Sequence, residues 1–171
     1  MARTTFLFLA LLTIAACQPE STTETTGGGA RTTTAPADLD VCSMATMDEL
    51  QTAAGLVSAT GMSSTSGGAD VCTWTGENGK IVVAQVFPSA SSYDQSRQAF
   101  ESQYGGTAED VTGVGEKGFF IAGNTGAIAT GTLVAQKGST PVSIQVMGGT
   151  SDAATRKNEA IAIAHVILGK L

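Results

Sequence analysis

The sequence has few basic residues, few aromatic residues and few of the side chains that bind transition metals. Nine Lys and Arg stand against fifteen Asp and Glu in 171 residues, which gives a formal net charge of −6. Proteins that bind nucleic acids usually carry a basic surface that neutralises phosphates, so this balance argues against nucleic acid as a partner. One His and three Cys leave little for a zinc site, and we expect no metal and no cofactor.

Residues 1–16 have the order of a lipoprotein signal peptide. One basic residue, Arg3, precedes an apolar stretch over residues 6–14, which is too short to cross about 30 Å of hydrocarbon as a helix. Residues 14–17 are Ile-Ala-Ala-Cys, which resembles the lipobox of bacterial lipoproteins. The resemblance implies that the mature chain begins at Cys17 and that lipid on Cys17 anchors it to a membrane. The alternative is ordinary secretion, with Cys17 left as a free thiol or removed.

The anchor predicts a location in the cell envelope. The two or three acyl chains of a bacterial lipoprotein hold a protein firmly at a bilayer, whereas one chain holds it only marginally. Gln18, and not Asp, follows the lipidated position. In a Gram-negative host we therefore expect the periplasmic face of the outer membrane.

A tether follows the anchor. Residues 18–37 hold seven Thr, three consecutive Gly and two Pro, and no side chain there is large and apolar enough to form a core. Such a segment cannot offset the entropy lost on ordering, so we expect residues 17–37 to form a lipidated, disordered tether, open to glycosylation. Residues 38–171 then form a single domain.

Periodicity and turn residues predict an α+β domain: a twisted antiparallel sheet of about five to six strands flanked by three helices. A capping box at Thr46 and Glu49 opens the first helix, and Ser151 is the expected cap of the last. Apolar residues on both faces of the later strands indicate a sheet covered by helices on one side and partly covered on the other. The expected strands are 71–75, 80–87, 117–122, 127–136 and 142–147, and the expected helices are 46–54, 91–104 and 152–171. The apolar face expected for the last helix is Ala160, Ile161, Ala164, Ile167, Leu168 and Leu171.

Cys42 and Cys72 are the two cysteines left when Cys17 carries lipid. An even pair in an oxidising compartment favours a disulfide between them. An alternative is a soft Cu(I) site in which Met44 and Met47 join Cys42, but methionines at this density usually fill gaps in a core.

Trp74 is the candidate anchor of the interior. It lies two residues after Cys72 in a predicted strand, so both side chains point to one face and Trp74 is expected to cover the disulfide. The functional alternative is a ligand pocket in which Trp74 forms a wall beside Tyr93 or Phe100.

No pattern of catalytic residues stands out, and we expect no enzyme. His165 is the only His, and its spacing singles out no nucleophile or orienting acid. Residues 113–118 match a dinucleotide-binding spacing, but a strand and not a helix is expected to follow, which predicts a tight turn. The acidic pairs Asp48-Glu49 and Glu109-Asp110 are expected at solvated positions, the second near a loop.

Three short motifs resemble a family of exported bacterial lipoproteins with an uncharacterised domain. They are Cys-Ser-Met at 42–44, Cys-Thr-Trp at 72–74 and Gly-Val-Gly-Glu-Lys-Gly-Phe at 113–119, and the similarity covers residues 40–171. The chain departs from the family's Asp-Pro-Cys-Ser-Leu and Gly-Val-Gly-Asp-Lys-Ala-Phe patterns at several positions. The resemblance implies a PsbP/Mog1-like fold, a structural pairing of Cys42 with Cys72 and a non-enzymatic accessory role.

We therefore predict a lipid-anchored binding or scaffolding lipoprotein of the cell envelope without catalytic activity, which engages a partner protein. The alternatives are a carrier of a small apolar ligand, a serine-type envelope hydrolase that would use His165, and an inhibitor or immunity protein.

Overall fold

The structure is a computed structural model that describes residues 39–88 and 93–171. The expected signal peptide, Cys17 and the tether lie outside the described residues, as do the first two residues of the helix expected at 91–104. The domain expected at 38–171 is described from Leu39 onward.

The described residues form one seven-stranded sheet with three α-helices and one short 3₁₀ helix, so the predicted α+β class is confirmed. Every strand pairs antiparallel with its neighbours in the order β1-β2-β3-β7-β6-β5-β4. The elements are η1 (Val41–Met44), α1 (Met47–Ala54), β1 (Thr60–Ser66), β2 (Ala69–Thr75), β3 (Lys80–Val86), α2 (Tyr93–Tyr104), β4 (Glu109–Val111), β5 (Lys117–Thr125), β6 (Ile128–Lys137), β7 (Thr140–Gly148) and α3 (Ala153–Lys170).

Local signals fix the ends of α1 as predicted. The backbone N–H of Thr46 donates to the Glu49 carboxylate at 2.8 Å, and the Glu49 N–H donates to the Thr46 hydroxyl at 3.3 Å. Gly55 ends the helix in the left-handed conformation, with φ 60°. These contacts satisfy backbone groups that a helix end leaves unpaired.

The cap expected for α3 was off by one residue. Asp152, and not Ser151, is the N-cap, because the Asp152 carboxylate accepts the Thr155 N–H at 2.7 Å. Ser151 instead offers its carbonyl to the Arg156 guanidinium.

The buried stripe of α3 also differs from the expected one. Ile163 and Arg156 are buried, whereas Ile161 is half-buried and Leu171 is 37% exposed. The stripe in contact with the sheet is Arg156, Ala160, Ile163, Ala164, Ile167 and Leu168.

The strands β1 and β4 were not predicted. β1 joins β2 through Gly67 and Gly68, which both have positive φ, as a two-residue hairpin turn requires. β4 contains Glu109 and Asp110, which are exposed near the loop at 112–116, as predicted.

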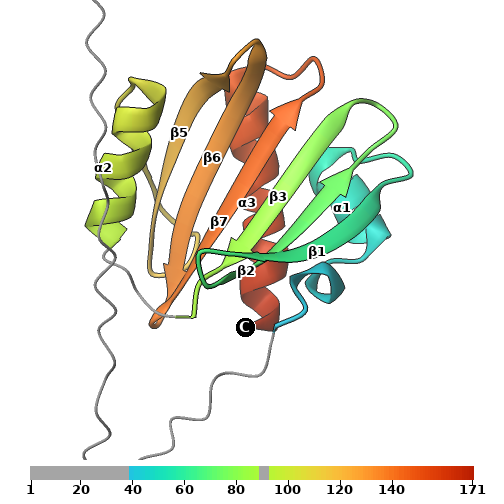
Figure 1. The fold of residues 1–171 in the computed structure, drawn as a ribbon, viewed down its shortest axis with the longest axis horizontal. Helices are drawn as coiled ribbons and strands as arrows, with labels where there is room; N and C mark the ends of the chain where they lie inside the picture. Colours follow the sequence, from blue (N-terminus) through green and yellow to red (C-terminus); the bar gives the residue numbers. More distant parts are fainter. Residues whose placement is uncertain (1–38, 89–92) are drawn as a thin grey trace, which may run out of the picture. The chain divides into compact units, whose positions relative to one another are not determined.

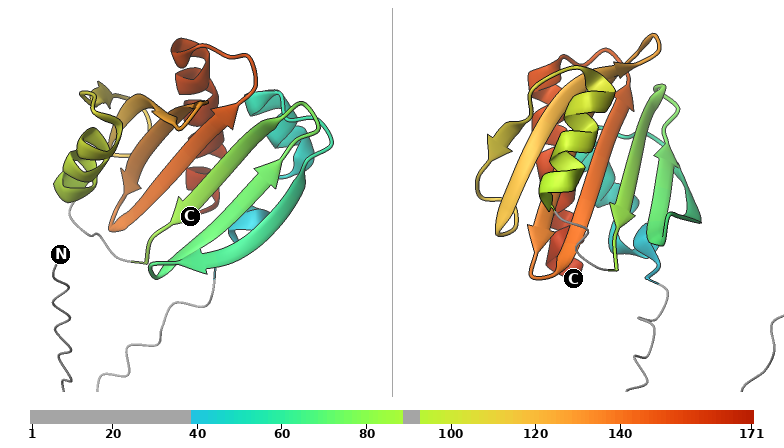
Figure 2. Two further views of the ribbon diagram at one scale, coloured as in Figure 1. Left: turned by 45° about the horizontal axis from the view of Figure 1, so that its top comes forward. Right: turned by 60° about the vertical axis from the view of Figure 1, so that its left-hand side comes forward.

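The two faces of the sheet are covered unequally, as predicted. α3, α1 and η1 lie behind the sheet in Figure 1, and their apolar side chains form the main core with Trp74, Leu133 and Ile144. α2 lies on the other side of the sheet beside β5 (Figure 2). We call the side that bears α3 the helical face.

Candidate functional site

The second face of the sheet has a half that no described helix covers (Figure 1). The register places Thr73 opposite Val83, and Val83 opposite Gln145, across β2, β3 and β7. Ile81 lies opposite Met147 in the next row. Because residues opposite each other share a face, these side chains form one continuous surface. We call it the open face, and its six half-buried residues are Thr73, Ile81, Val83, Gln85, Gln145 and Met147.

α2 borders the open face and docks through aromatic side chains. The Tyr93 and Phe119 ring centroids lie 5.2 Å apart, and those of Phe100 and Phe119 lie 6.3 Å apart. The ammonium of Lys117 lies 4.3 Å from the Tyr93 ring centroid. Burial raises the pKa of the Tyr93 hydroxyl. The structure thus brings Tyr93 and Phe100 together, in a cluster on β5 and β6.

A polar network fixes the boundary between α2 and the open face. The Gln145 side-chain amide donates to the Tyr104 hydroxyl at 2.7 Å and to the Thr132 hydroxyl at 3.3 Å. Tyr104 reaches this position because Gly123 lies beneath its ring. A Cβ at Gly123 would come within 2.5 Å of the Tyr104 ring.

A small cavity lies where the open face meets Phe100. Its volume is about 120 Å³, and Val83, Gln85, Phe100, Ser143 and Gln145 line it. Pockets for drug-sized ligands are usually roughly 300–1,000 Å³. This cavity therefore has room for a side chain, but not for a large apolar ligand.

Trp74 lies on the opposite side of the sheet from Tyr93 and Phe100. It is 2% exposed and belongs to the main core. Its ring packs against Gly61, where a Cβ would lie 3.0 Å from the indole and 3.4 Å from the Cys72 sulfur. The structure therefore does not bring Trp74 into a pocket with the other two aromatics.

Cys42 and Cys72 lie at disulfide-bonding distance, with Cα atoms 5.1 Å apart, compatible with the predicted disulfide. The pair connects η1 to β2, and Cys72 is fully buried. Met44 is also buried in the core, whereas Met47 is 37% exposed. Met44 thus fills the core as the packing interpretation expects.

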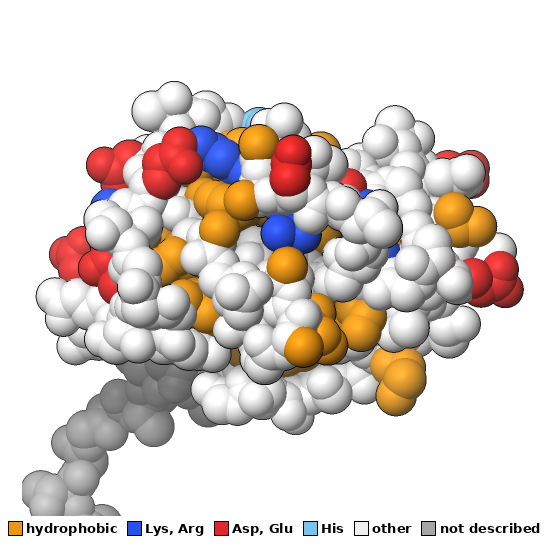
Figure 3. Space-filling model, turned by 90° about the horizontal axis from the view of Figure 1, so that it is seen from above, with side chains coloured by type: hydrophobic (Ala, Val, Ile, Leu, Met, Phe, Trp, Pro, Cys, Tyr) orange, Lys and Arg blue, Asp and Glu red, His pale blue; other side chains and the backbone are white. Residues whose placement is uncertain are grey.

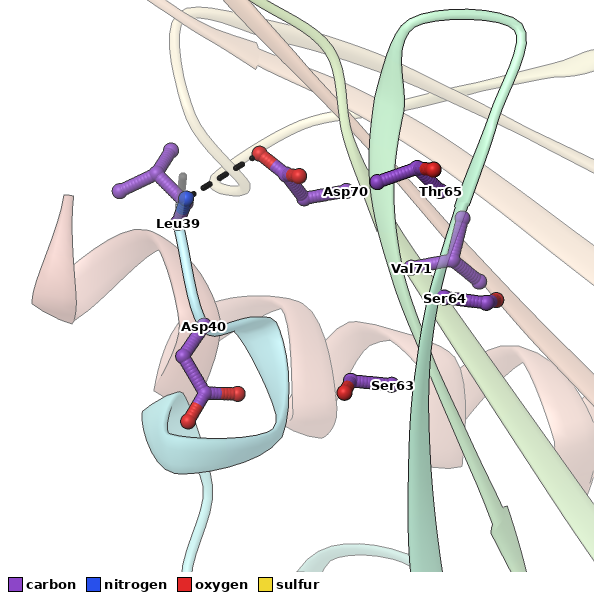
Figure 4. Close-up of a pocket in the computed structure, with 7 residues that line it drawn as sticks. All are labelled: Leu39, Asp40, Ser63, Ser64, Thr65, Asp70 and Val71. Carbon is purple, nitrogen blue, oxygen red and sulfur yellow. Dashed lines mark hydrogen bonds between the residues drawn. The ribbon is translucent and has the colours of Figure 1, made fainter. Parts of the chain in front are cut away.

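A depression of about 380 Å³ lies between η1 and the edge of the sheet (Figure 4). Asp70 accepts the Leu39 N–H at 3.2 Å, and Asp40 accepts the Cys42 N–H at 3.2 Å. The side chain of Ser63 in β1 points toward η1. The Asp70 carboxylate of β2 thus holds the beginning of the described chain against the sheet, and the Asp40 carboxylate caps η1. Both are structural roles.

Lys117 and Gly118 of the segment 113–118 begin β5, and the residues before them form a turn, as predicted. It connects β4 to β5, so no helix follows it. Gly115 has φ 64°, and a Cβ there would lie 2.4 Å from the Gln136 carbonyl oxygen. The Glu116 carboxylate accepts the Gly138 N–H at 3.1 Å. These contacts hold the loop against the turn between β6 and β7, and a depression of about 310 Å³ lies beside it.

His165 is exposed on α3, and no hydrogen bond or ion pair links its imidazole to another described residue. The acidic pairs have structural partners. Glu109 forms an ion pair with Lys157, and Asp110 lies 2.5 Å from Arg97. Asp48 and Glu49 lie in the first turn of α1, where the helix dipole favours negative charge.

Metal-binding and membrane-spanning features are absent from the part of the chain that the structure describes. No three His, Cys, Asp or Glu side chains gather there as ligands, and no helix there is long and apolar enough to span a bilayer.

Seen from above in Figure 3, hydrophobic side chains form several groups with acidic and basic side chains beside them.

No family model, curated protein or solved structure matches the chain. The resemblance to PsbP/Mog1-like lipoproteins therefore stays a prediction.

The open face is the feature that sequence reasoning missed. The expectation of partial cover on one side of the sheet pointed to it, but did not say which strands stay uncovered. That depends on α2 docking over Gly123 through Tyr104, a contact between residues 19 positions apart that has no local signal.

Proposed function

We propose that the protein is a lipid-anchored binding module of the cell envelope, without catalytic activity, that holds a partner protein on its open face. The observation that carries the proposal is the uncovered half of the sheet over β2, β3 and β7. There, Ile81, Val83 and Met147 alternate with Thr and Gln side chains in one surface.

The make-up of the open face favours a protein over a small molecule. Protein interfaces that form between separately folded partners are mixed in polarity, with hydrogen-bonding groups beside apolar ones. The open face has this mixture, and the cavity of about 120 Å³ beside Phe100 has room for one inserted side chain. A carrier of an apolar ligand needs an enclosed apolar pocket several times larger.

The geometry around His165 supports a binding role over hydrolysis. A serine hydrolase needs an imidazole within about 3 Å of a serine hydroxyl and an acid that orients the ring. His165 is exposed on α3, on the other side of the sheet from the open face, and has no such partner among the described residues.

The test is site-specific photo-crosslinking in the cells that make the protein. A photoreactive side chain replaces Thr73 or Gln85 on the open face, and Ile128, which is 47% exposed at the start of β6, is the matched control. We expect one recurrent protein adduct from both open-face positions and none from Ile128.

The same adduct must weaken when Val83→Asp places a charge in the centre of the open face. Equal adducts from all three positions, or adducts unaffected by Val83→Asp, would refute docking at this surface. A small apolar molecule that copurifies with the wild type and is lost from Val83→Asp would replace the partner protein with a ligand.

A further inference from the structure

We propose that β1 pairs antiparallel with β1 of a second copy of this chain, so that two sheets join into one across a two-fold axis. The inference goes beyond the proposed function and does not depend on the open face or on the lipid anchor. It rests on the two edges of the sheet, which differ in strand length, charge and ion pairing.

The outer edge of β1 is unprotected. β1 is an end strand of the sheet, and no other described strand pairs with its outer side. All seven of its residues, Thr-Gly-Met-Ser-Ser-Thr-Ser, are exposed, and none is charged or Pro. Soluble proteins usually block such an edge with Lys, Pro, a bulge or a covering element, because its free N–H and C=O groups can pair with another chain.

The other edge is protected. β4 has three residues, and two of them are Glu109 and Asp110. Glu109 forms an ion pair with Lys157 of α3, and Asp110 forms one with Arg97 of α2. A strand added beside β4 would have to pass these charged side chains. Within the described sheet, charged side chains and ion pairs thus oppose pairing at the β4 edge, and the β1 edge has neither.

β1 also has a regular backbone that can accept a partner strand. It pairs with β2 over seven consecutive positions, from Thr60 opposite Thr75 to Ser66 opposite Ala69, with no residue inserted. A bulge would bend the strand away from a neighbour. Alternate N–H and C=O groups of β1 therefore point outward along its whole length.

The sequence of β1 suits a second copy as the occupant. The chain carries a net charge of −6, yet two β1 strands bring no like charges into contact because β1 has none. Pairing centred on Ser63 uses all seven residues and places Met62 opposite Ser64 of the other copy. The two Met62 side chains then lie diagonally across the interface, at about 7–8 Å between Cα atoms, within reach of a long side chain.

Met62 supplies the apolar surface for this contact. It is 70% exposed, the most exposed large hydrophobic side chain among the described residues. Self-pairing would shield it from water. Since the β4 edge is blocked, the association stops at two copies and does not continue into a fibre.

The experiment traps this register in the full chain carrying Cys17→Ser. Ser63→Cys places one thiol from each copy at the two-fold axis, and Ile128→Cys is the control at the start of β6. Because Ser63 lies opposite Cys72, peptide mapping must show that the dimer is joined through position 63 and that Cys42–Cys72 is intact. We expect mild oxidation to give a disulfide-linked dimer from Ser63→Cys at least tenfold faster than from Ile128→Cys. Equal rates would overturn the proposed pairing.

A second measurement covers the chain without an added thiol. Sedimentation equilibrium of the Cys17→Ser chain should give a dimer fraction that rises with concentration, and Met62→Lys and Ser64→Lys should each abolish it. Ile128→Lys, which adds the same charge at another exposed hydrophobic position, should leave it unchanged. A monomer at all concentrations, or a dimer that survives both β1 variants, would refute the inference. All three positions are exposed, and matching far-UV circular dichroism confirms that the variants fold.

Discussion

Gly123 and Tyr104 control how α2 meets the sheet. The Tyr104 ring covers the strand where Gly123 has no side chain, and the Tyr104 hydroxyl then lies within hydrogen-bonding distance of Gln145. The contact sets how much of the second sheet face α2 leaves uncovered. The absence of a side chain at Gly123 in β5 thus determines how far the open face extends.

Gly123→Ala should loosen α2. The added Cβ would lie 2.5 to 2.8 Å from three atoms of Tyr104, so helix or strand must shift. Overpacking of this kind typically costs about 1–3 kcal/mol, which urea unfolding measures. Gly106→Ala is the matched control, because its Cβ would have no neighbour closer than 3.8 Å, and it should cost less than half as much. Equal losses would show that Tyr104 does not depend on Gly123.

Asp152 gives a prediction on pH. Hydrogen bonds from the Thr155 backbone N–H hold the pKa of the Asp152 carboxyl below its ordinary value. A carboxyl with a lowered folded-state pKa contributes stability above its unfolded pKa and loses it as pH falls through the folded one. NMR titration of Asp152 should give the lowered pKa.

Asp152→Asn keeps a capping oxygen but cannot titrate. It should therefore retain α3 while removing this part of the acid dependence of unfolding. An ordinary pKa for Asp152 would contradict the cap.

Between elements, a buried ion pair connects α1, β3 and α3. The Lys80 ammonium lies 2.5 Å from Glu159 of α3 and donates to the Ala54 carbonyl at 2.7 Å. The side chains of Lys80 and Glu159 are 8% and 13% exposed. The last turn of α1 is thus held to the sheet through one ammonium group.

Lys80→Met should destabilise the domain strongly. Removal of one partner leaves the Glu159 charge buried, which typically costs about 3–5 kcal/mol. The double variant Lys80→Met with Glu159→Leu should recover most of that loss, as denaturant unfolding of both variants would measure. A double variant as unstable as the single one would mean that the Ala54 contact, and not the buried charge, dominates.

The Cys42–Cys72 pair ties η1 to β2 across 30 residues. A loop of this length corresponds to roughly 3.5 kcal/mol in the chain-entropy model. The Cys17→Ser chain should therefore show no free thiol when unfolded without reductant, and reduction should lower its urea midpoint. One reactive thiol per chain would exclude the disulfide.

The elements with local signals could be predicted, and those without could not. α1 followed from Thr46, Glu49 and Gly55, whose effects act within one helical turn. β1 is polar apart from Met62 and shows no alternation of apolar and polar residues, so its sequence did not predict a strand. β4 is short and acidic, and it forms a strand because β5 and two ion pairs hold it.

At the scale of the whole molecule, the two candidate surfaces adjoin, because Met62 of β1 lies opposite Thr73 of the open face. The open face spans β2, β3 and β7, whereas the β1 edge is at the end of the sheet (Figure 2). An antiparallel pair of β1 strands keeps the helical faces of both copies on one side. Leu39 bonds to Asp70, whose register partner Val86 belongs to the core on that face. Both described chains would then begin on the same side of the joined sheet.

The candidate site was predictable only in outline. Pattern and composition indicated a sheet with one partly uncovered face, and a core position for Trp74. Which of Trp74, Tyr93 and Phe100 are neighbours depends on the face of the sheet on which each side chain lies. That face follows from the register of β2 and β5 within the full sheet.

The most direct test of a lipid-anchored binding module is the intact mass of the mature protein isolated from the cells that make it, compared with Cys17→Ser. We predict a chain that begins at Cys17, carries the mass of two or three acyl chains and fractionates with membranes. Cys17→Ser should lose both the added mass and the membrane association. A wild-type chain without acyl mass, or one cleaved at another residue, would contradict the anchor.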